Sequence, residues 1–131
     1  MYSRIEIEQY LSDIKDSVTQ GRFQIERNSN RKANQDLFMN YVIDETKAAD
    51  IILGLQVEHF SSKTQNRKKG YEHEVLYIFG RKIPLLERFG TNEVQVPLYI
   101  KFNKLPDCYV IVVSFHEQKY EMRYPFTAQQ D

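Results

Sequence analysis

Two histidines and a tyrosine–lysine pair in the second half of the chain have side chains suited to chemistry. His73 lies in the string YEHEVLY, and His116 lies in VVSFHEQ. Imidazole changes charge closest to neutral pH, so either ring could take or supply a proton. Tyr99 and Lys101 lie two residues apart, a spacing that projects both from one face of a β-strand, where a phenol and an ammonium could bind a phosphate. Each histidine could equally be structural, and the Tyr99–Lys101 pair could simply face solvent.

Positive charge is densest in the string KTQNRKKG. The basic residues of this string are Lys63, Arg67, Lys68 and Lys69, and a second cluster contains Arg27, Arg31 and Lys32. Basic residues in a flexible loop can hold a phosphodiester backbone by Coulomb attraction and charge-assisted hydrogen bonds. A solvated hairpin tip explains the same residues without any function, and the sequence does not choose between the two.

Composition and missing motifs exclude several classes of protein. The chain has 131 residues, and 18 Lys and Arg balance 18 Asp and Glu, so it cannot coat nucleic acid through bulk positive charge. No pattern typical of nucleotide-binding loops, serine hydrolases, zinc proteases or calcium sites occurs. The histidines lie far apart and Cys108 is the only cysteine, so we expect no metal, cofactor or disulfide. The N-terminal string MYSRIEIEQY does not resemble a secretory signal and no apolar run approaches the ~20 residues of a membrane span, which predicts a cytoplasmic protein.

Helical patterns dominate the first half of the chain. Ser3 and Glu6 have the spacing of a capping box, and apolar residues then recur at helical spacing until Gly21. Asp44 can cap another helix that ends near Gly54. The other expected segments are a short strand over 23–25, a polar loop over 27–36 and a weaker helical stripe over 37–42.

Alternation with a period of two marks the second half as strands. Residues 94–102 alternate apolar and polar side chains, the string CYVIVVSF predicts a central strand, and LPDC between them predicts a hairpin turn. Further strand candidates cover 60–65, 72–79 and 120–126. Helices followed by strands predict one α+β domain over residues 1–131, with the helices packed on one face of an antiparallel sheet.

Several of these strings resemble a known family. The helical IILGL followed by EHF, and the strand pair carrying PLYIKF and YVIVVSFH, are similar to the motility quorum-sensing regulator (MqsR) family of toxin–antitoxin mRNA interferases. The resemblance runs from the first helix to about His116 and consists mainly of hydrophobic strand patterns. It implies the RelE-like fold with a curved antiparallel sheet. It also implies a toxin that cleaves single-stranded mRNA without a metal and is inhibited by a cognate antitoxin.

The resemblance also suggests positions for the active residues. Tyr99 and Lys101 match the Tyr-x-Lys strand of the family, and Lys63 follows the EHF turn with a displacement of about one position. His73 stands where the family has a glutamine, and His116 replaces a terminal lysine. Residues 80–93 look like an insertion, and the tail beyond Glu117 looks like an extension.

These residues suggest a metal-free mechanism. RNA cleavage by the ribose 2′-hydroxyl needs a base, an acid and positive charge on the phosphate. We hypothesise that His73 and His116 share the acid and base roles, while Lys63 and Lys101 hold the phosphate and Tyr99 orients or stacks. Arg67, Lys68 and Lys69 would bind the RNA backbone.

Two other interpretations fit the same residues. The chain could be a non-catalytic module that docks a protein or RNA partner through its sheet and basic loop, with incidental histidines. It could also be a nuclease that acts only on the ribosome, which a cleavage assay on purified RNA distinguishes from the first hypothesis.

Overall fold

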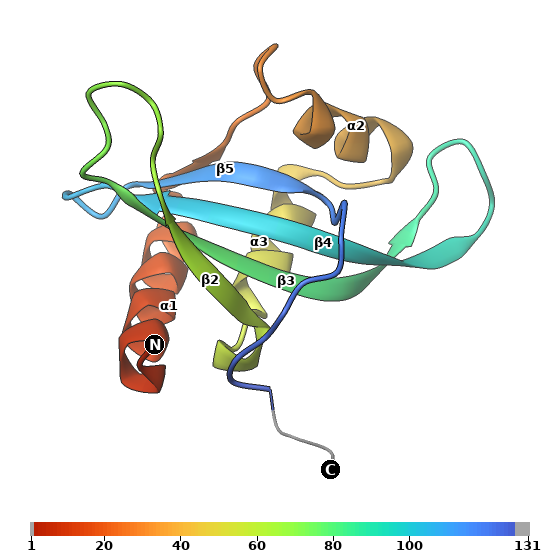
Figure 1. The fold of residues 1–131 in the computed structure, drawn as a ribbon. Helices are drawn as coiled ribbons and strands as arrows, with labels where there is room; N and C mark the ends of the chain where they lie inside the picture. The colour runs from red at the N-terminus through yellow and green to blue at the C-terminus, as the bar shows by residue number, and fades with distance from the viewer. Residues whose placement is uncertain (1, 128–131) are drawn as a thin grey trace.

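A computed structural model of the chain describes residues 2–127, which form helices followed by a twisted sheet (Figure 1). The helices are α1 (Arg4–Thr19), α2 (Lys32–Asn40) and α3 (Glu45–Leu53), and a 3₁₀ turn, η1, covers Val57–His59. The strands are β1 (Phe23–Ile25), β2 (Phe60–Gln65), β3 (Val75–Leu86), β4 (Glu93–Lys104) and β5 (Val110–Glu117). The α+β class predicted from the sequence is confirmed.

The sheet has the strand order β1-β5-β4-β3-β2. Hairpins join β2 to β3, β3 to β4 and β4 to β5, so these four strands are antiparallel. The short β1 pairs parallel with β5, so the sheet is mixed, not wholly antiparallel as predicted. Residues 80–93 complete β3 and form its hairpin with β4.

Helices α1 and α3 cover one face of the sheet, which we call the helix face; the opposite face is the open face (Figure 1). The Ser3 hydroxyl accepts a hydrogen bond from the Glu6 backbone N–H, and Asp44 caps α3 in the same way through the Lys47 N–H. Both helices begin where the sequence predicted, but only half of the expected capping box forms, because the Glu6 carboxylate bonds Lys63 and Tyr77 and not the Ser3 backbone. The largest side chains buried beneath these helices include Phe60, Phe79, Phe102 and Phe115.

Helix α2 lies along β5 (Figure 1). It spans residues that the sequence assigned to a polar loop, and it ends before Tyr41 and Val42, which the sequence placed on its stripe. The buried Asn34 explains its position: its amide donates to the backbone carbonyls of Glu26 and Val113, and its carbonyl accepts from the Phe115 N–H. This side chain therefore takes the place of a neighbouring strand beyond the end of β1.

Two β-bulges change which face the side chains occupy. One lies between Phe60 and Ser62 in β2, and the other lies in β5, where Val112 and Ser114 oppose Phe102 and Lys101. A bulge adds one residue to one strand, so side chains beyond it move to the other face.

The C-terminal segment 118–127, which we call the strap, crosses the open face (Figure 1). The sequence predicted a strand over 120–126, but the strap forms no strand and does not join the sheet. Its backbone bonds the sheet once, from the Gln118 N–H to the Pro97 carbonyl. Across residues 2–127, none of the helices is both long and apolar enough to cross a membrane.

Candidate functional site

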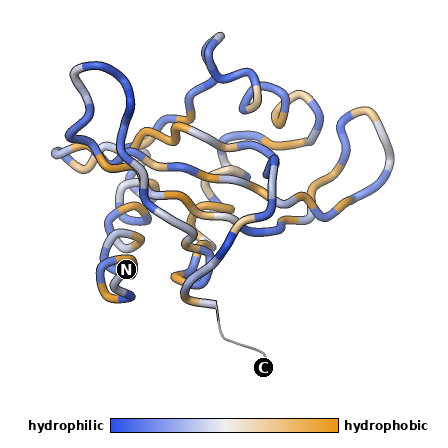
Figure 2. The backbone as a smooth tube through the Cα atoms, viewed as in Figure 1, coloured by the Kyte–Doolittle hydropathy of each residue, from blue (hydrophilic) through white to orange (hydrophobic). Residues whose placement is uncertain are grey.

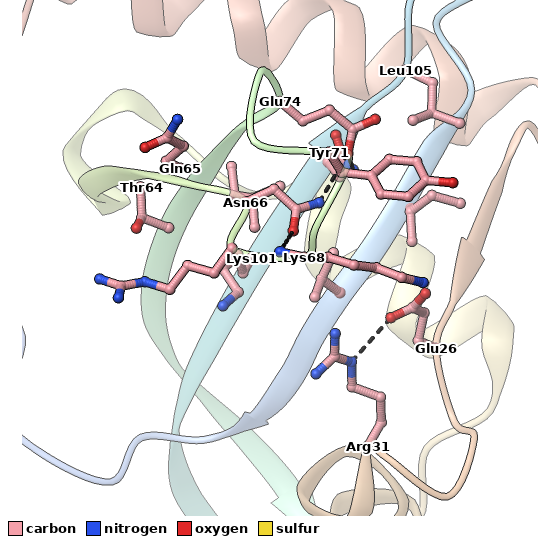
Figure 3. Close-up of a pocket in the computed structure, with 15 residues that line it drawn as sticks. Glu26, Arg31, Thr64, Gln65, Asn66, Lys68, Tyr71, Glu74, Lys101 and Leu105 are labelled. Atoms are coloured by element: carbon pink, nitrogen blue, oxygen red, sulfur yellow. Dashed lines mark hydrogen bonds and ion pairs between the residues drawn. The ribbon is translucent and has the colours of Figure 1, made fainter.

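A cleft of about 540 Å³ lies on the open face beneath the β2–β3 loop (Figure 3). Its floor is formed by β4 and β5, including Lys101 and Asn103. One wall is the β2–β3 loop, residues 66–74, which is hydrophilic over most of its length (Figure 2). The facing wall is the connection from β1 to α2, which contributes Glu26 and Arg31. Three segments that are distant in sequence thus meet at the cleft.

Lys101 is the only one of the sheet's half-buried lysines that has no carboxylate partner among the described residues. Lys63 contacts Glu6 at 2.8 Å and Lys104 contacts Asp13 at 2.7 Å. Burial, together with the positive charge of Arg31, lowers the pKa of Lys101 below its ordinary value. A half-buried ammonium without a counter-ion has a strong tendency to bind an anion.

The walls of the cleft carry both positive and negative side chains, and hydrogen bonds hold several of these side chains in place. Arg31 Nε contacts Glu26 Oε1 at 3.0 Å. The amides of Asn66 and Asn103 donate to Glu74 Oε1 at 2.9 and 2.8 Å, which fixes the loop to the floor. Figure 3 shows Lys68 extending from the loop toward the opposite wall. The cleft is therefore not a uniformly positive surface.

Tyr99 and His116 stack beside the cleft on the open face. They are cross-strand partners, with ring centroids 5.0 Å apart and an interplanar angle of 8°. His116 Nδ1 lies 2.7 Å from the Glu117 carbonyl, which can only accept, so Nδ1 carries the proton and Nε2 keeps its lone pair. Burial lowers the pKa of His116 below 6.5, and the charges of Lys119 and Lys101 lower it further, while the Glu117 carbonyl opposes them. Burial raises the pKa of Tyr99 to about 12, so this phenol stays neutral.

Lys101 and His116 are diagonal neighbours on adjacent strands. Lys101 pairs with Ser114, two residues before His116. Diagonal side chains on one face of an antiparallel pair start about 7–8 Å apart, although His116 lines a separate hollow beside α2 and not the cleft that contains Lys101. The structure thus brings together Tyr99, Lys101 and His116 from the residues that the sequence proposed.

His73 does not join this group. The sequence predicted a strand over 72–79, but β3 begins at Val75, and His73 lies in an exposed turn of the β2–β3 loop and does not line the cleft. A hydrogen bond from the Asn66 N–H to the Glu74 carbonyl closes the β2–β3 loop. The residues between them, including His73, therefore lie in turns and not in β3. His116 lies level with Gly80, and the five strand steps from Val75 to Gly80 alone span about 16 Å. The hypothesis that two imidazoles share one phosphate is therefore corrected.

Lys63 lies on the helix face, opposite Lys101. The bulge after Phe60 places Phe60 and Lys63 on the same side of β2, although they are three positions apart and regular alternation would put them on opposite sides. The ammonium of Lys63 bonds Glu6 of α1, which also accepts from the Tyr77 hydroxyl at 2.8 Å. Lys63 is a structural residue in this position, and its predicted contact with the phosphate is corrected.

The basic loop divides in the structure. Arg67 and Lys68 line the cleft, whereas Lys69 is exposed and does not. Arg31 lines the opposite wall, although the sequence assigned it no role beyond membership of a basic cluster. Its position immediately before α2 could not be seen in the sequence, because the polar string around it predicted a loop.

Comparison of the chain with known protein families, curated proteins and solved structures finds no match. Within residues 2–127, no three His, Cys, Asp or Glu side chains gather in a way that could hold a metal ion. The chemistry that the site can perform therefore has to be argued from its own groups: an unpaired ammonium, a guanidinium, and an imidazole with an available nitrogen.

Proposed function

We propose that the chain is an endoribonuclease that cleaves single-stranded RNA on the open face, with His116 and Lys101 as its catalytic residues. The observation that carries the proposal is the diagonal pairing of His116, whose Nε2 has no partner among the described residues, with Lys101, which has no counter-ion there. One of these groups is a base and the other is a cation that can donate a proton.

The proposed step is attack by a ribose 2′-oxygen on the adjacent phosphorus. His116 Nε2 takes the 2′-hydroxyl proton as the bond from 2′-oxygen to phosphorus forms. The bond from phosphorus to the 5′-oxygen breaks, and the Lys101 ammonium donates a proton to the leaving oxygen. The products are a 2′,3′-cyclic phosphate and a 5′-hydroxyl. The lowered pKa of Lys101 favours donation, and its positive charge stabilises the phosphate in the transition state.

The surroundings of these residues favour a single-stranded substrate. Arg31, Arg67 and Lys68 offer local contacts for phosphates around Lys101. Aromatic rings beside the cleft can stack on bases, which are accessible only when they are unpaired. Glu26 and Glu74 weaken the overall positive potential, so binding depends on these few contacts.

Incubating the purified protein with a long unstructured RNA in EDTA tests the proposal. We expect cleavage that leaves cyclic phosphate ends, and we expect His116→Ala to reduce its rate by roughly 10²–10⁴-fold. His73→Ala is the matched control, because its ring lies outside the site, and it should cleave as the wild type does. RNA that binds but stays intact would instead support the non-catalytic alternative, and cleavage only on ribosomes would support the ribosome-dependent one.

The role as a toxin with a cognate antitoxin is part of the same proposal. It is supported by the resemblance to the MqsR family and by the proposed activity, since uncontrolled cleavage of messages is harmful to a cell. Expression of the wild type should arrest growth, and His116→Ala should not. Co-expression of the protein encoded by a neighbouring gene should restore growth if that protein is the antitoxin.

A further inference from the structure

The strap is attached to the sheet at specific points. The Gln118 side chain donates to the Leu98 carbonyl at 3.0 Å and to the Tyr124 hydroxyl at 3.1 Å. Gly80 lies directly beneath it, and a Cβ there would come within 2.5 Å of the Tyr124 hydroxyl and 2.9 Å of Met122 Sδ. The sheet thus has a residue without a side chain where the strap crosses, and the strap is a fixed wall on the open face.

A groove of about 610 Å³ lies between the strap and the sheet, which is within the size range of small-ligand sites. Ile78 and Ser62, which are cross-strand partners, contribute to its floor. Tyr99 bounds it on the sheet side, and Tyr120 and Tyr124 bound it on the strap side. Its surface is mainly apolar and aromatic, although Glu121 and Arg123 of the strap also line it.

The register of the strands places the groove beside the phosphate site. Ile78 of the floor pairs with Lys101, and neighbouring strands lie about 4.8 Å apart. Tyr120 approaches Tyr99 edge-on, with centroids 6.4 Å apart, and 67% of the Tyr120 residue surface is exposed. An unpaired ammonium and an aromatic groove are therefore immediate neighbours on one face.

We infer that this groove binds the base of the nucleotide whose phosphate lies at Lys101, with the ring of Tyr120 as its outer wall. A single-stranded nucleotide presents a flat aromatic base beside an anion, which is the combination that the groove and Lys101 accommodate. The groove supplies the hydroxyl groups of Ser61 and Ser62, which both donate and accept hydrogen bonds. It therefore prefers an unstacked base over a paired one without strict selection of base type. This inference rests on the proposed ribonuclease function.

Binding of a 2′-O-methyl hexanucleotide, which has no 2′-hydroxyl to attack, tests the groove separately from cleavage. Replacing each nucleotide in turn with an abasic residue should weaken binding to the wild type by roughly 5- to 100-fold at one position. The same abasic residue should have little further effect on Tyr120→Ala, because that variant already lacks the wall. Tyr120→Phe is the matched control, because it keeps the ring and should bind as the wild type does.

The outcomes separate the two proposals. If the hexanucleotide binds and RNA is cut, but neither Tyr120→Ala nor any abasic position matters, the groove is not a base site and the ribonuclease proposal survives. If no RNA is bound, both proposals fail. If Tyr120→Ala weakens intact and abasic oligonucleotides equally at all positions, the strap acts without contacting a base and the inference is overturned.

Discussion

The two faces of the sheet treat their lysines differently. On the helix face, Lys63 and Lys104 have carboxylate partners on α1, and each ammonium also lies within 6 Å of a tyrosine ring centroid. On the open face, Lys101 has no such partner among the described residues, and its pKa is lowered. Ammonium groups on one sheet can therefore serve different purposes. Charge that is neutralised contributes to folding, whereas charge left unpaired is available to a ligand.

Exchanging the two lysines for methionine tests this contrast most strongly. Lys101→Met should lower the rate of RNA cleavage by roughly 10²–10³-fold, because the phosphate is deprived of its stabilising charge. Lys63→Met should cleave within about twofold of the wild type, since it lies on the far side of the sheet. Single-turnover kinetics on one RNA give both values. Equal reductions of the cleavage rate in the two variants would contradict the assignment of Lys101 to catalysis and of Lys63 to structure.

Within the open face, the basic loop should show a smaller contrast. The double variant Arg67→Gln/Lys68→Gln removes two cations that line the cleft, so RNA binding should weaken several-fold. The slope of log K against log salt should become shallower by about 0.7 for each phosphate that the protein no longer binds. Lys69→Gln, outside the cleft, should leave both quantities unchanged. Titrations at several salt concentrations measure the slope, and an effect of Lys69→Gln as large as that of the double variant would count against the cleft.

The paired charges of the helix face should appear in stability. Glu6→Gln removes the ion pair with Lys63 and should lower the free energy of unfolding by at most about 1 kcal/mol, because the pair is partly exposed. Hydrogen bonds from Lys63 and Tyr77 lower the pKa of Glu6 below 4.5. Its stabilising effect is therefore present above pH 4.5 and disappears as the pH falls through the lowered pKa of the folded state. Urea unfolding at neutral and acidic pH compares the variant with the control Glu93→Gln, which changes an exposed carboxylate that has no ion-pair partner among the described residues. A difference that persists in acid would argue against the pair.

The smallest expected effect concerns the titration of His116. Its pKa should lie below 6.5, so His116 is neutral and able to act as a base at neutral pH, and cleavage should fall as the pH drops through that pKa. Lys119→Ala should move the pKa upward, toward 6.5, because a nearby positive charge is removed. NMR titration of the imidazole checks this, with Lys32→Ala as a control. A fall of the pKa in Lys119→Ala would contradict the assignment.

Local patterns predicted most of the fold. The caps at Ser3 and Asp44 and the alternation in residues 94–102 depend on neighbours in sequence, and the structure confirms them. Helix α2 was partly missed because one of the residues that anchor it, Asn34, has partners on β5 that are about 80 residues away. Such long-range bonds leave no periodic pattern in the sequence.

The candidate site was only partly predictable. Tyr99 and Lys101 share a face by simple alternation, and the structure bears this out. A single extra residue in β2 places Lys63 on the helix face, and alternation alone cannot reveal a bulge. The turns that close the β2–β3 loop removed His73 from its predicted strand. Arg31 was not predicted for the site because only the folded chain shows that the connection from β1 to α2 lines the same cleft as Lys101.

The amide of Asn34 has a consequence for self-association. At the β1 edge of the sheet, a second copy could pair only with the three-residue strand β1. The backbone groups of β5 beyond β1, the Val113 carbonyl and the Phe115 N–H, are already bonded to Asn34. Short or occupied margins discourage edge-to-edge aggregation. The outer margin of β2 is the longer one and has no neighbour among the described strands. If two copies paired through their β2 edge strands, neither would have another long edge strand for a third copy. This route of assembly therefore stops at a dimer and does not grow into a fibre.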